Sequence, residues 1–134
     1  MGDKVIYIID DDPVFRLIAR KLIEKSGKFS KLEFFENGYD ALIAVKNAIA
    51  NSTPPNAIML DIEMPKMNGW QFMENFTILP DDKVKGINIY IVSSSIALED
   101  RNKAKSYSSI KLYIAKPITV DIINELGAEE KSHA

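Results

Sequence analysis

Short apolar runs alternate with amphipathic stretches along this 134-residue chain. The apolar runs have the length and β-branched content of strands, and strands are predicted at 5–9, 32–35, 57–60, 87–92 and 112–115. Between these runs, apolar residues recur every three or four positions, as in a helix with one buried face. Helices are therefore predicted around 15–22, 42–49, 72–76, 97–107 and 120–126, the first stopping near Gly27 and the third before Pro80.

This alternation predicts an α/β fold with a parallel sheet and helices on both faces. The expected architecture is the flavodoxin-like (βα)5 fold, with its five strands in the order 2-1-3-4-5. The run at 87–92 is the most hydrophobic, as expected of a strand that is buried on both faces. Because no linker or repeat interrupts the pattern, 1–134 is predicted to be a single domain, with a core at about 4–126 and a solvated tail at 128–134.

Polar side chains follow four of the predicted strands. They are Asp10 and Asp11 after the first strand, Asp61 after the third, Ser93, Ser94 and Ser95 after the fourth, and Lys116 with Pro117 after the fifth. Ligands of open parallel sheets bind beyond the carboxyl ends of the strands, at the point where the strand order reverses. These side chains are therefore predicted to meet in one crevice.

The types of side chain at the strand ends indicate a particular chemistry. Crowded carboxylates repel one another unless a cation lies among them, and magnesium suits such a site because it accepts one or two carboxylates and keeps positions for water and phosphate oxygens. Lysine and serine can neutralise and hydrogen-bond a phosphoryl group. An aspartate can itself be the nucleophile and form an aspartyl-phosphate. Magnesium-assisted phosphoryl transfer onto an aspartate is the expected reaction.

Composition narrows the class of protein further. The chain is 46% hydrophobic and 27% charged with a net charge of −2, which is typical of a globular domain and gives no basic surface for nucleic acid or an anionic membrane. It has no cysteine, so disulfides, thiolate metal sites and thiol nucleophiles are excluded. No apolar run approaches the roughly 20 residues needed to span a bilayer, and no signal peptide is evident. A cytoplasmic location is expected.

Four segments of the chain carry a family resemblance. They are IYIIDDDP, MLDIEMPKMNGWQF, IYIVSSS and YIAKP. In this order and spacing, the chain resembles a response-regulator receiver domain, the phosphoacceptor of two-component signalling, from about Lys4 to Leu126. It is most similar to the stand-alone, chemotaxis-receiver type, since too few residues follow the last predicted helix for a DNA-binding module.

The resemblance implies a role for each residue of the constellation. The phosphorylated residue would be Asp61, and the Mg²⁺ ligands would be Asp11, Asp61, Asp10 (mostly through water) and the backbone carbonyl of Glu63, with Mn²⁺ as a substitute. The phosphoryl group would be bound by Ser93, Lys116 and the backbone amides of Ile62 and Ser94. The switch residues would be Ser93 and Tyr113, and Pro117 would follow a cis peptide bond. Ser93 stands where the family more often has threonine, and it retains the hydroxyl.

The resemblance also implies the partners. A phosphohistidine on a sensor histidine kinase or a histidine phosphotransfer protein would donate the phosphoryl group. The response would be read by another protein, on the face formed by the helix at 97–107, the strand at 112–115 and the helix at 120–126. The protein would be a monomer or a phosphorylation-dependent dimer, and it would be no enzyme beyond its own phosphorylation and dephosphorylation. Ser95 could tune the hydrolysis, and Trp70 is interpreted as a packing residue of the loop after Asp61 that could report on the site by fluorescence.

Two alternative functions stay open from the sequence. Asp10, Asp12 and Val14 fit the Asp-x-Asp-x-(Thr or Val) motif of haloacid-dehalogenase-type phosphatases, in which the first aspartate is the nucleophile. The chain is short for that fold, lacks a late acidic pair on a strand, and would leave Asp61 unexplained. The other alternative is a receiver-like scaffold that never carries phosphate, against which the intact set of site residues argues.

The three adjacent aspartates at 10–12 are predicted to divide into two metal ligands and one helix cap. Asp12 precedes Pro13, and aspartate at the N-cap with proline at the first helical position is a favoured helix start. Asp12→Ser should leave magnesium-dependent phosphorylation unchanged, whereas Asp11→Ala should abolish it. The mass of the intact protein after incubation with acetyl phosphate checks both variants, and equal effects would contradict the division.

Overall fold

The computed structural model describes residues 4–126; the predicted tail at 128–134 lies outside the described residues. Strands and helices alternate as the sequence pattern predicts. The elements are β1 (Val5–Ile9), α1 (Pro13–Ser26), β2 (Lys31–Phe35), α2 (Gly38–Ala50), β3 (Ala57–Leu60), α3 (Gly69–Phe76), α4 (Asp81–Val84), β4 (Asn88–Ser93), α5 (Leu98–Lys105), β5 (Ile110–Ala115) and α6 (Val120–Glu125).

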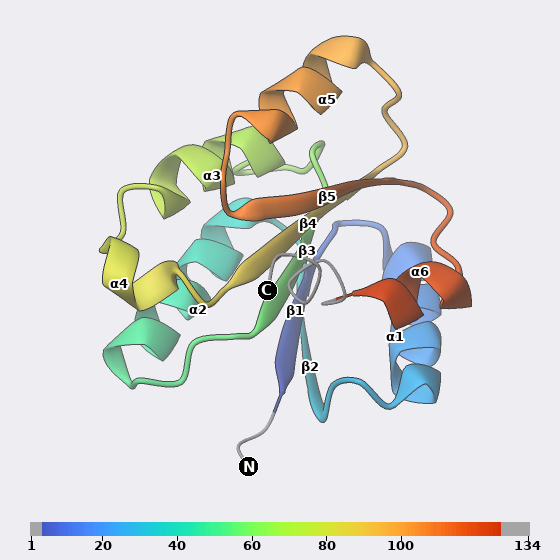
Figure 1. Cartoon of the computed structure of the whole chain (residues 1–134), viewed down its shortest axis with the longest axis horizontal. Coiled ribbons are helices and arrows are strands. Elements are labelled where there is room, and N and C mark those ends of the chain that lie inside the picture. Colours follow the sequence, from blue (N-terminus) through green and yellow to red (C-terminus); the bar gives the residue numbers. More distant parts are fainter. Residues whose placement is uncertain (1–3, 127–134) are drawn as a thin grey trace.

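The strands form one parallel sheet in the order β2-β1-β3-β4-β5, which confirms the predicted topology. Helices α1 and α6 cover one face of the sheet, and α2, α3, α4 and α5 lie on the other (Figure 1). The order places β1 and β3 side by side at the centre, although α1, β2 and α2 separate them in the chain. This is the point at which the strand order reverses, so the ends of β1 and β3 open onto the same crevice.

Two apolar layers enclose the sheet, and alternate residues of each central strand enter different layers. In β1, Ile6 and Ile8 pack toward α1 and α6, whereas Tyr7 and Ile9 pack toward α2 and α3. All six residues of β4 are buried, as expected for a strand covered on both faces. Burying an isoleucine of this kind contributes about 1.5–3 kcal/mol relative to leaving it exposed. The central strands are thus firmly held, and their carboxyl ends are fixed in space.

Local sequence signals set the ends of the helices. The side chain of Asp12 accepts a hydrogen bond from Val14 N at 2.9 Å, and Pro13 is the first helical residue, which confirms the predicted cap of α1. The helix ends at Gly27, whose φ of 69° is in the left-handed region that favours glycine. Asn68 begins α3 with a reciprocal capping box to Gln71.

Two of the differences between the predicted and the observed elements have a clear physical reason. Five helices are predicted, but the short helix α4 follows Pro80 as a sixth. A single turn is too short to show a helical period, so the hydrophobic pattern gives no sign of it. The last strand starts at Ile110, before the predicted start at 112, because its pairing with β4 continues across an irregularity between Ile89 and Tyr90.

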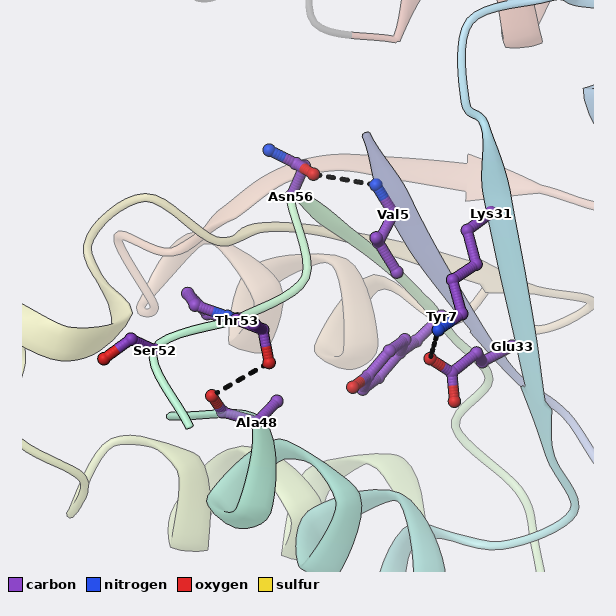
Figure 2. A pocket seen from close by; sticks show the side chains of 9 residues that line it. Val5, Tyr7, Lys31, Glu33, Ala48, Ser52, Thr53 and Asn56 are labelled. Carbon is purple, nitrogen blue, oxygen red and sulfur yellow. Dashed lines mark hydrogen bonds and ion pairs between the residues drawn. The ribbon is translucent and has the colours of Figure 1, made fainter. Parts of the chain in front are cut away.

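A cleft of about 470 Å³ opens at the amino end of the sheet, between β1, β2 and the segment that follows α2 (Figure 2). The ring of Tyr7 points into it, and Lys31 and Glu33 of β2 form an ion pair at 3.7 Å on one wall. Asn56 closes another side by accepting a hydrogen bond from Val5 N at 2.7 Å. The acidic residues follow the strands at the other edge, so this cleft is separate from them.

Within residues 4–126, no helix is both long enough and apolar enough to cross a membrane. This finding agrees with the absence of a long apolar run in the sequence.

Gly69 is predicted to be essential for the close approach of α3 to the chain after Asp61. A Cβ at Gly69 would collide with the backbone carbonyl of Asp61 and lie 3.0 Å from Ile62 Cα, whereas a Cβ at Gly86 would meet nothing within 4 Å. Gly69→Ala should therefore lower the free energy of unfolding by about 1–3 kcal/mol. Gly86→Ala, the matched control, should change it by no more than about 0.5 kcal/mol. Urea unfolding measures both, and equal stabilities of the two variants would contradict the collision.

Candidate functional site

Three carboxylates meet at the carboxyl edge of the sheet. Asp10 and Asp11 follow β1, Asp61 follows β3, and the register that pairs Ile9 with Leu60 brings the two strand ends level. One oxygen from each carboxylate lies within 4.8 Å of the others. Asp10 and Asp61 are only 1% and 8% exposed, whereas Asp11 is exposed to solvent. The predicted convergence of these three residues is therefore present in the structure.

Lys116 is the cation that faces this cluster. Its Nζ lies 2.8 Å from Asp10 Oδ2 and 3.7 Å from Asp61 Oδ2, so it contacts both buried carboxylates. The end of β5 positions the residue, because Lys116 N donates to Ser93 O at 2.9 Å. Its ammonium also lies 4.5 Å from the centre of the Phe15 ring. The guanidinium of Arg16 donates to the backbone carbonyl of Asp10 at 2.7 Å, so two cations lie near three carboxylates, and the cluster keeps an excess of negative charge.

The peptide bond between Lys116 and Pro117 is cis, as the family resemblance implied.

The burial of Asp61 raises its pKa from 3.8 to about 6. Desolvation is the largest cause, and the negative charge of Asp10 adds to it. Lys116 and the backbone N–H of Ile62, which donates to Asp61 Oδ1 at 2.9 Å, act in the opposite direction without cancelling the rise. A carboxyl group whose charge is this costly in a strand-end crevice is a candidate functional residue on physical grounds.

The acidic cluster fits a hard divalent cation. Its donors are all carboxylate oxygens, it carries surplus negative charge, and Asp11 keeps one side open to water. Glu63, whose backbone carbonyl is the remaining predicted ligand, lies in the exposed segment that follows β3. Among residues 4–126, this carbonyl accepts no backbone hydrogen bond, so it is available as a ligand.

The segment Ser93–Ser95 continues from β4 beside the acidic cluster. Ser93 is 3% exposed, and its Oγ accepts a hydrogen bond from Ser95 N at 3.1 Å. The hydroxyl of Tyr113 donates to Ser95 O at 2.8 Å. The pairing of β4 with β5 explains this contact, because it places Tyr113 opposite Ile91, two residues before Ser93. The two predicted switch residues are thus joined through Ser95; their roles remain predictions.

Sequence reasoning missed Asp100 near the site and misplaced Trp70. Asp100 accepts hydrogen bonds from Ser95 Oγ at 2.6 Å and from Trp70 Nε1 at 3.1 Å. Trp70 is no loop residue, because it lies in the first turn of α3 and is 8% exposed. No pattern in the sequence signals the contact between Asp100 and Trp70, since 30 positions separate them and an aspartate early in a helix is common.

Comparison with known proteins identifies the family. A family model described as the response regulator receiver domain matches residues 6–126. The chain therefore belongs to the response regulator receiver domain family. Members of this family accept a phosphoryl group on an aspartate, and in general they act as signalling switches and not as enzymes. The whole-chain match does not favour the phosphatase alternative.

Individual relatives agree with this assignment. The chain is 34% identical over 116 residues to the sensor histidine kinase CheAY of Helicobacter pylori, covering 87% of the chain but only 13% of that kinase. The crystal structure of a two-component response regulator from Cytophaga hutchinsonii superposes with a TM-score of 0.88 at 23% identity, covering 98% of this chain and 99% of that one. The Mn²⁺-bound form of the response regulator Rcp1 superposes with a TM-score of 0.70 at 21% identity, covering 93% of this chain and 92% of that one. The two structures share the fold.

The raised pKa of Asp61 predicts that the charge of this residue lowers the free energy of unfolding, and that the effect depends on pH. Below pH 3.8 the carboxyl is protonated in both the folded and unfolded states and contributes nothing. As the pH rises from 3.8 to about 6, the unfolded chain releases its proton first, so folding stability falls, and above 6 the whole penalty is present. Asp61→Asn removes the charge, so the metal-free variant should be more stable than the parent by roughly 1–2 kcal/mol at neutral pH.

Urea unfolding in a chelator between pH 4 and 8 measures this gain. It should shrink steadily toward pH 4, and millimolar Mg²⁺ should reduce it at neutral pH by stabilising the parent protein. A gain in stability that does not vary with pH would show that the charge of Asp61 does not destabilise the folded protein.

Proposed function

We propose that this chain is a phosphoacceptor switch in which Asp61 receives a phosphoryl group from a phosphohistidine. The observation that carries the proposal is the position of the Asp61 carboxylate, which lies between two further carboxylates and 3.7 Å from the ammonium of Lys116. No packing requirement explains an arrangement in which burial makes a negative charge costly. The arrangement is useful if a cation and a phosphoryl group enter it.

The proposed reaction uses an Asp61 oxygen as the nucleophile. A bond forms from this oxygen to phosphorus, and the bond between phosphorus and the donor's imidazole nitrogen breaks, so the imidazole leaves with the electron pair. Apart from the Asp61 nucleophile, the protein contributes chiefly by positioning the reacting groups and by stabilising their charge. Water later attacks the phosphorus of the acyl-phosphate, the bond from phosphorus to the Asp61 oxygen breaks, and inorganic phosphate leaves as the carboxylate is restored.

The metal in this proposal is Mg²⁺, held by Asp10, Asp11, Asp61 and the backbone carbonyl of Glu63. When bound, it would offset the negative charge of Asp61 and of the phosphoryl group during the transfer. The all-oxygen donor set supports this choice. Mn²⁺ is proposed as a substitute, since one neighbour of the same fold is a Mn²⁺-bound form.

Lys116 and Ser93 are proposed to hold the phosphoryl group, together with the backbone amides of Ile62 and Ser94. Lys116 already spans Asp10 and Asp61, so a small movement of its ammonium would reach a phosphoryl oxygen. Ser93 Oγ accepts a hydrogen bond from Ser95 N, which leaves its own proton free to donate to that group.

The donor and the downstream target are proposed to use different surfaces. On α1, which starts beside the acidic cluster, Val14, Leu17 and Ile18 are 62%, 53% and 46% exposed. Their apolar side chains support docking of the sensor kinase or phosphotransfer protein there, because the phosphohistidine must reach the adjacent Asp61. The downstream protein is proposed to bind the face of α5, β5 and α6, where Ile96 and Leu98 are 78% and 71% exposed.

The chain is proposed to form a single domain. The described residues share one sheet and its two apolar layers, which supports this proposal.

The decisive experiment is incubation with Mg²⁺ and acetyl phosphate, followed by measurement of the intact mass and location of the adduct. One phosphoryl group should appear on Asp61, and it should be absent in Asp61→Asn and in the presence of a chelator. Phosphate on Asp10 with rapid turnover of phosphomonoesters would instead support the phosphatase. No adduct with acetyl phosphate or a phosphohistidine donor would support the scaffold.

A further inference from the structure

Helix α5 has little apolar surface with which to hold its position. Of its residues Leu98–Lys105, only Ala104 is buried, and Leu98 is 71% exposed. Most of the stability of a short helix in a protein comes from packing of an apolar face, which this helix lacks. Other contacts must therefore hold α5 against the rest of the domain.

Trp70 provides those contacts. Its indole N–H donates to Asp100 Oδ1 at 3.1 Å, the ammonium of Lys103 lies 5.2 Å from its ring centre, and the ring of Tyr107 stacks on it at 6.1 Å and 11°. Aromatic stacking and contact with a cation both stabilise such an arrangement beyond simple burial. Trp70 is itself fixed in α3, where it is 8% exposed. It is thus the residue against which α5 is docked.

Asp100 extends this docking to the predicted switch segment. Its second oxygen, Oδ2, accepts a hydrogen bond from Ser95 Oγ at 2.6 Å, which is short, as expected when the acceptor is charged. Ser95 N donates to Ser93 Oγ, and Ser95 O accepts from the hydroxyl of Tyr113. One carboxylate therefore joins Trp70 to the segment that contains Ser93 and accepts the hydrogen bond of Tyr113.

The neighbouring residue of α5 acts on the same arrangement. The guanidinium of Arg101 lies 5.0 Å from the centre of the Tyr113 ring, so it covers the ring while the hydroxyl is bonded to Ser95. Asp100 and Arg101 together favour the conformer in which Tyr113 contacts the segment Ser93–Ser95. A change in that segment cannot occur without breaking or moving one of these contacts.

We propose that Asp100 is a positioning residue of this switch, which ties Ser95 to Trp70 and so couples the segment Ser93–Ser95 to the position of α5. The proposal rests on the proposed function of Asp61, because it is phosphorylation there that would displace the segment. Asp100 touches no reacting atom. It orders Ser93 and Ser94 before the phosphoryl group arrives, and it passes their displacement to α5.

A plainer role for Asp100 is a favourable charge in the first turn of α5. Glu99 occupies the same turn with the same charge and is exposed, so Glu99→Ala is the matched control. If the charge alone matters, the two alanine variants will behave alike.

The first test uses the unphosphorylated protein and the fluorescence of its single tryptophan. Asp100→Ala frees the indole N–H and should shift the emission of Trp70 to longer wavelength, whereas Glu99→Ala should leave it unchanged. Asp100→Asn keeps an oxygen that can accept from the indole and should restore most of the parent emission. Emission unchanged in Asp100→Ala would overturn the proposal, and this test holds whether or not Asp61 is phosphorylated.

The second test measures coupling during phosphorylation by acetyl phosphate and Mg²⁺. Asp100→Ala should be phosphorylated about fivefold more slowly than the parent, the typical effect of losing one ordering hydrogen bond, with Asp100→Asn intermediate and Glu99→Ala unchanged. Ser95→Ala cuts the link but leaves Trp70 bonded to Asp100. Its Asp61 should still gain mass, while the change in Trp70 emission that accompanies phosphorylation of the parent should be lost.

The outcomes separate the two proposals. A parent protein that gains no mass on Asp61 contradicts the proposed function, while the emission of its unphosphorylated variants still tests the tie to Trp70. A parent that is phosphorylated without a change in emission, or a Ser95→Ala variant that responds as the parent does, overturns the coupling alone.

Discussion

The repulsion between buried carboxylates at the ends of β1 and β3 is the constraint on which the rest of the site depends. The parallel register brings Asp10 and Asp61 level, and burial of both removes the water that would screen their charges. Lys116 offsets part of the repulsion, and the pKa of Asp61 nevertheless stays raised to about 6. The domain therefore holds a charge imbalance that a divalent cation can relieve.

A site of this kind is stable only because the surrounding fold is rigid. The central strands are buried on both faces, and α3 approaches so closely at Gly69 that no side chain fits between it and the backbone after Asp61. Burial of the two apolar layers thus stabilises the fold and offsets the free-energy cost of the buried charges at the strand ends. Such local strain is common at functional sites, where it favours the bound state over the free one.

The side of the molecule that carries α5 is held together by different interactions. Helix α5 is held less by apolar burial than by hydrogen bonds, a stacked ring and cations around Trp70. Contacts of this kind are directional, and a small displacement of Ser95 alters them more than it would alter a buried apolar face. The domain thus combines a rigid acidic site with a helix that is held by directional contacts.

The fold class, the strand order, the cap at Asp12 and the convergence of Asp10, Asp61 and Lys116 could all be predicted from the residues alone. The fold class follows from local periodicity, the cap from the Asp12-Pro13 pair, and the convergence from the rule that parallel strands end at one edge, while the strand order is the common one for such a sheet. None of these needs knowledge of side-chain packing. Tertiary structure alone decided the single-turn helix α4, the raised pKa of Asp61 and the link from Trp70 through Asp100 to Ser95. Burial depth and contacts between residues 30 positions apart depend on how elements pack, and no local pattern records that packing.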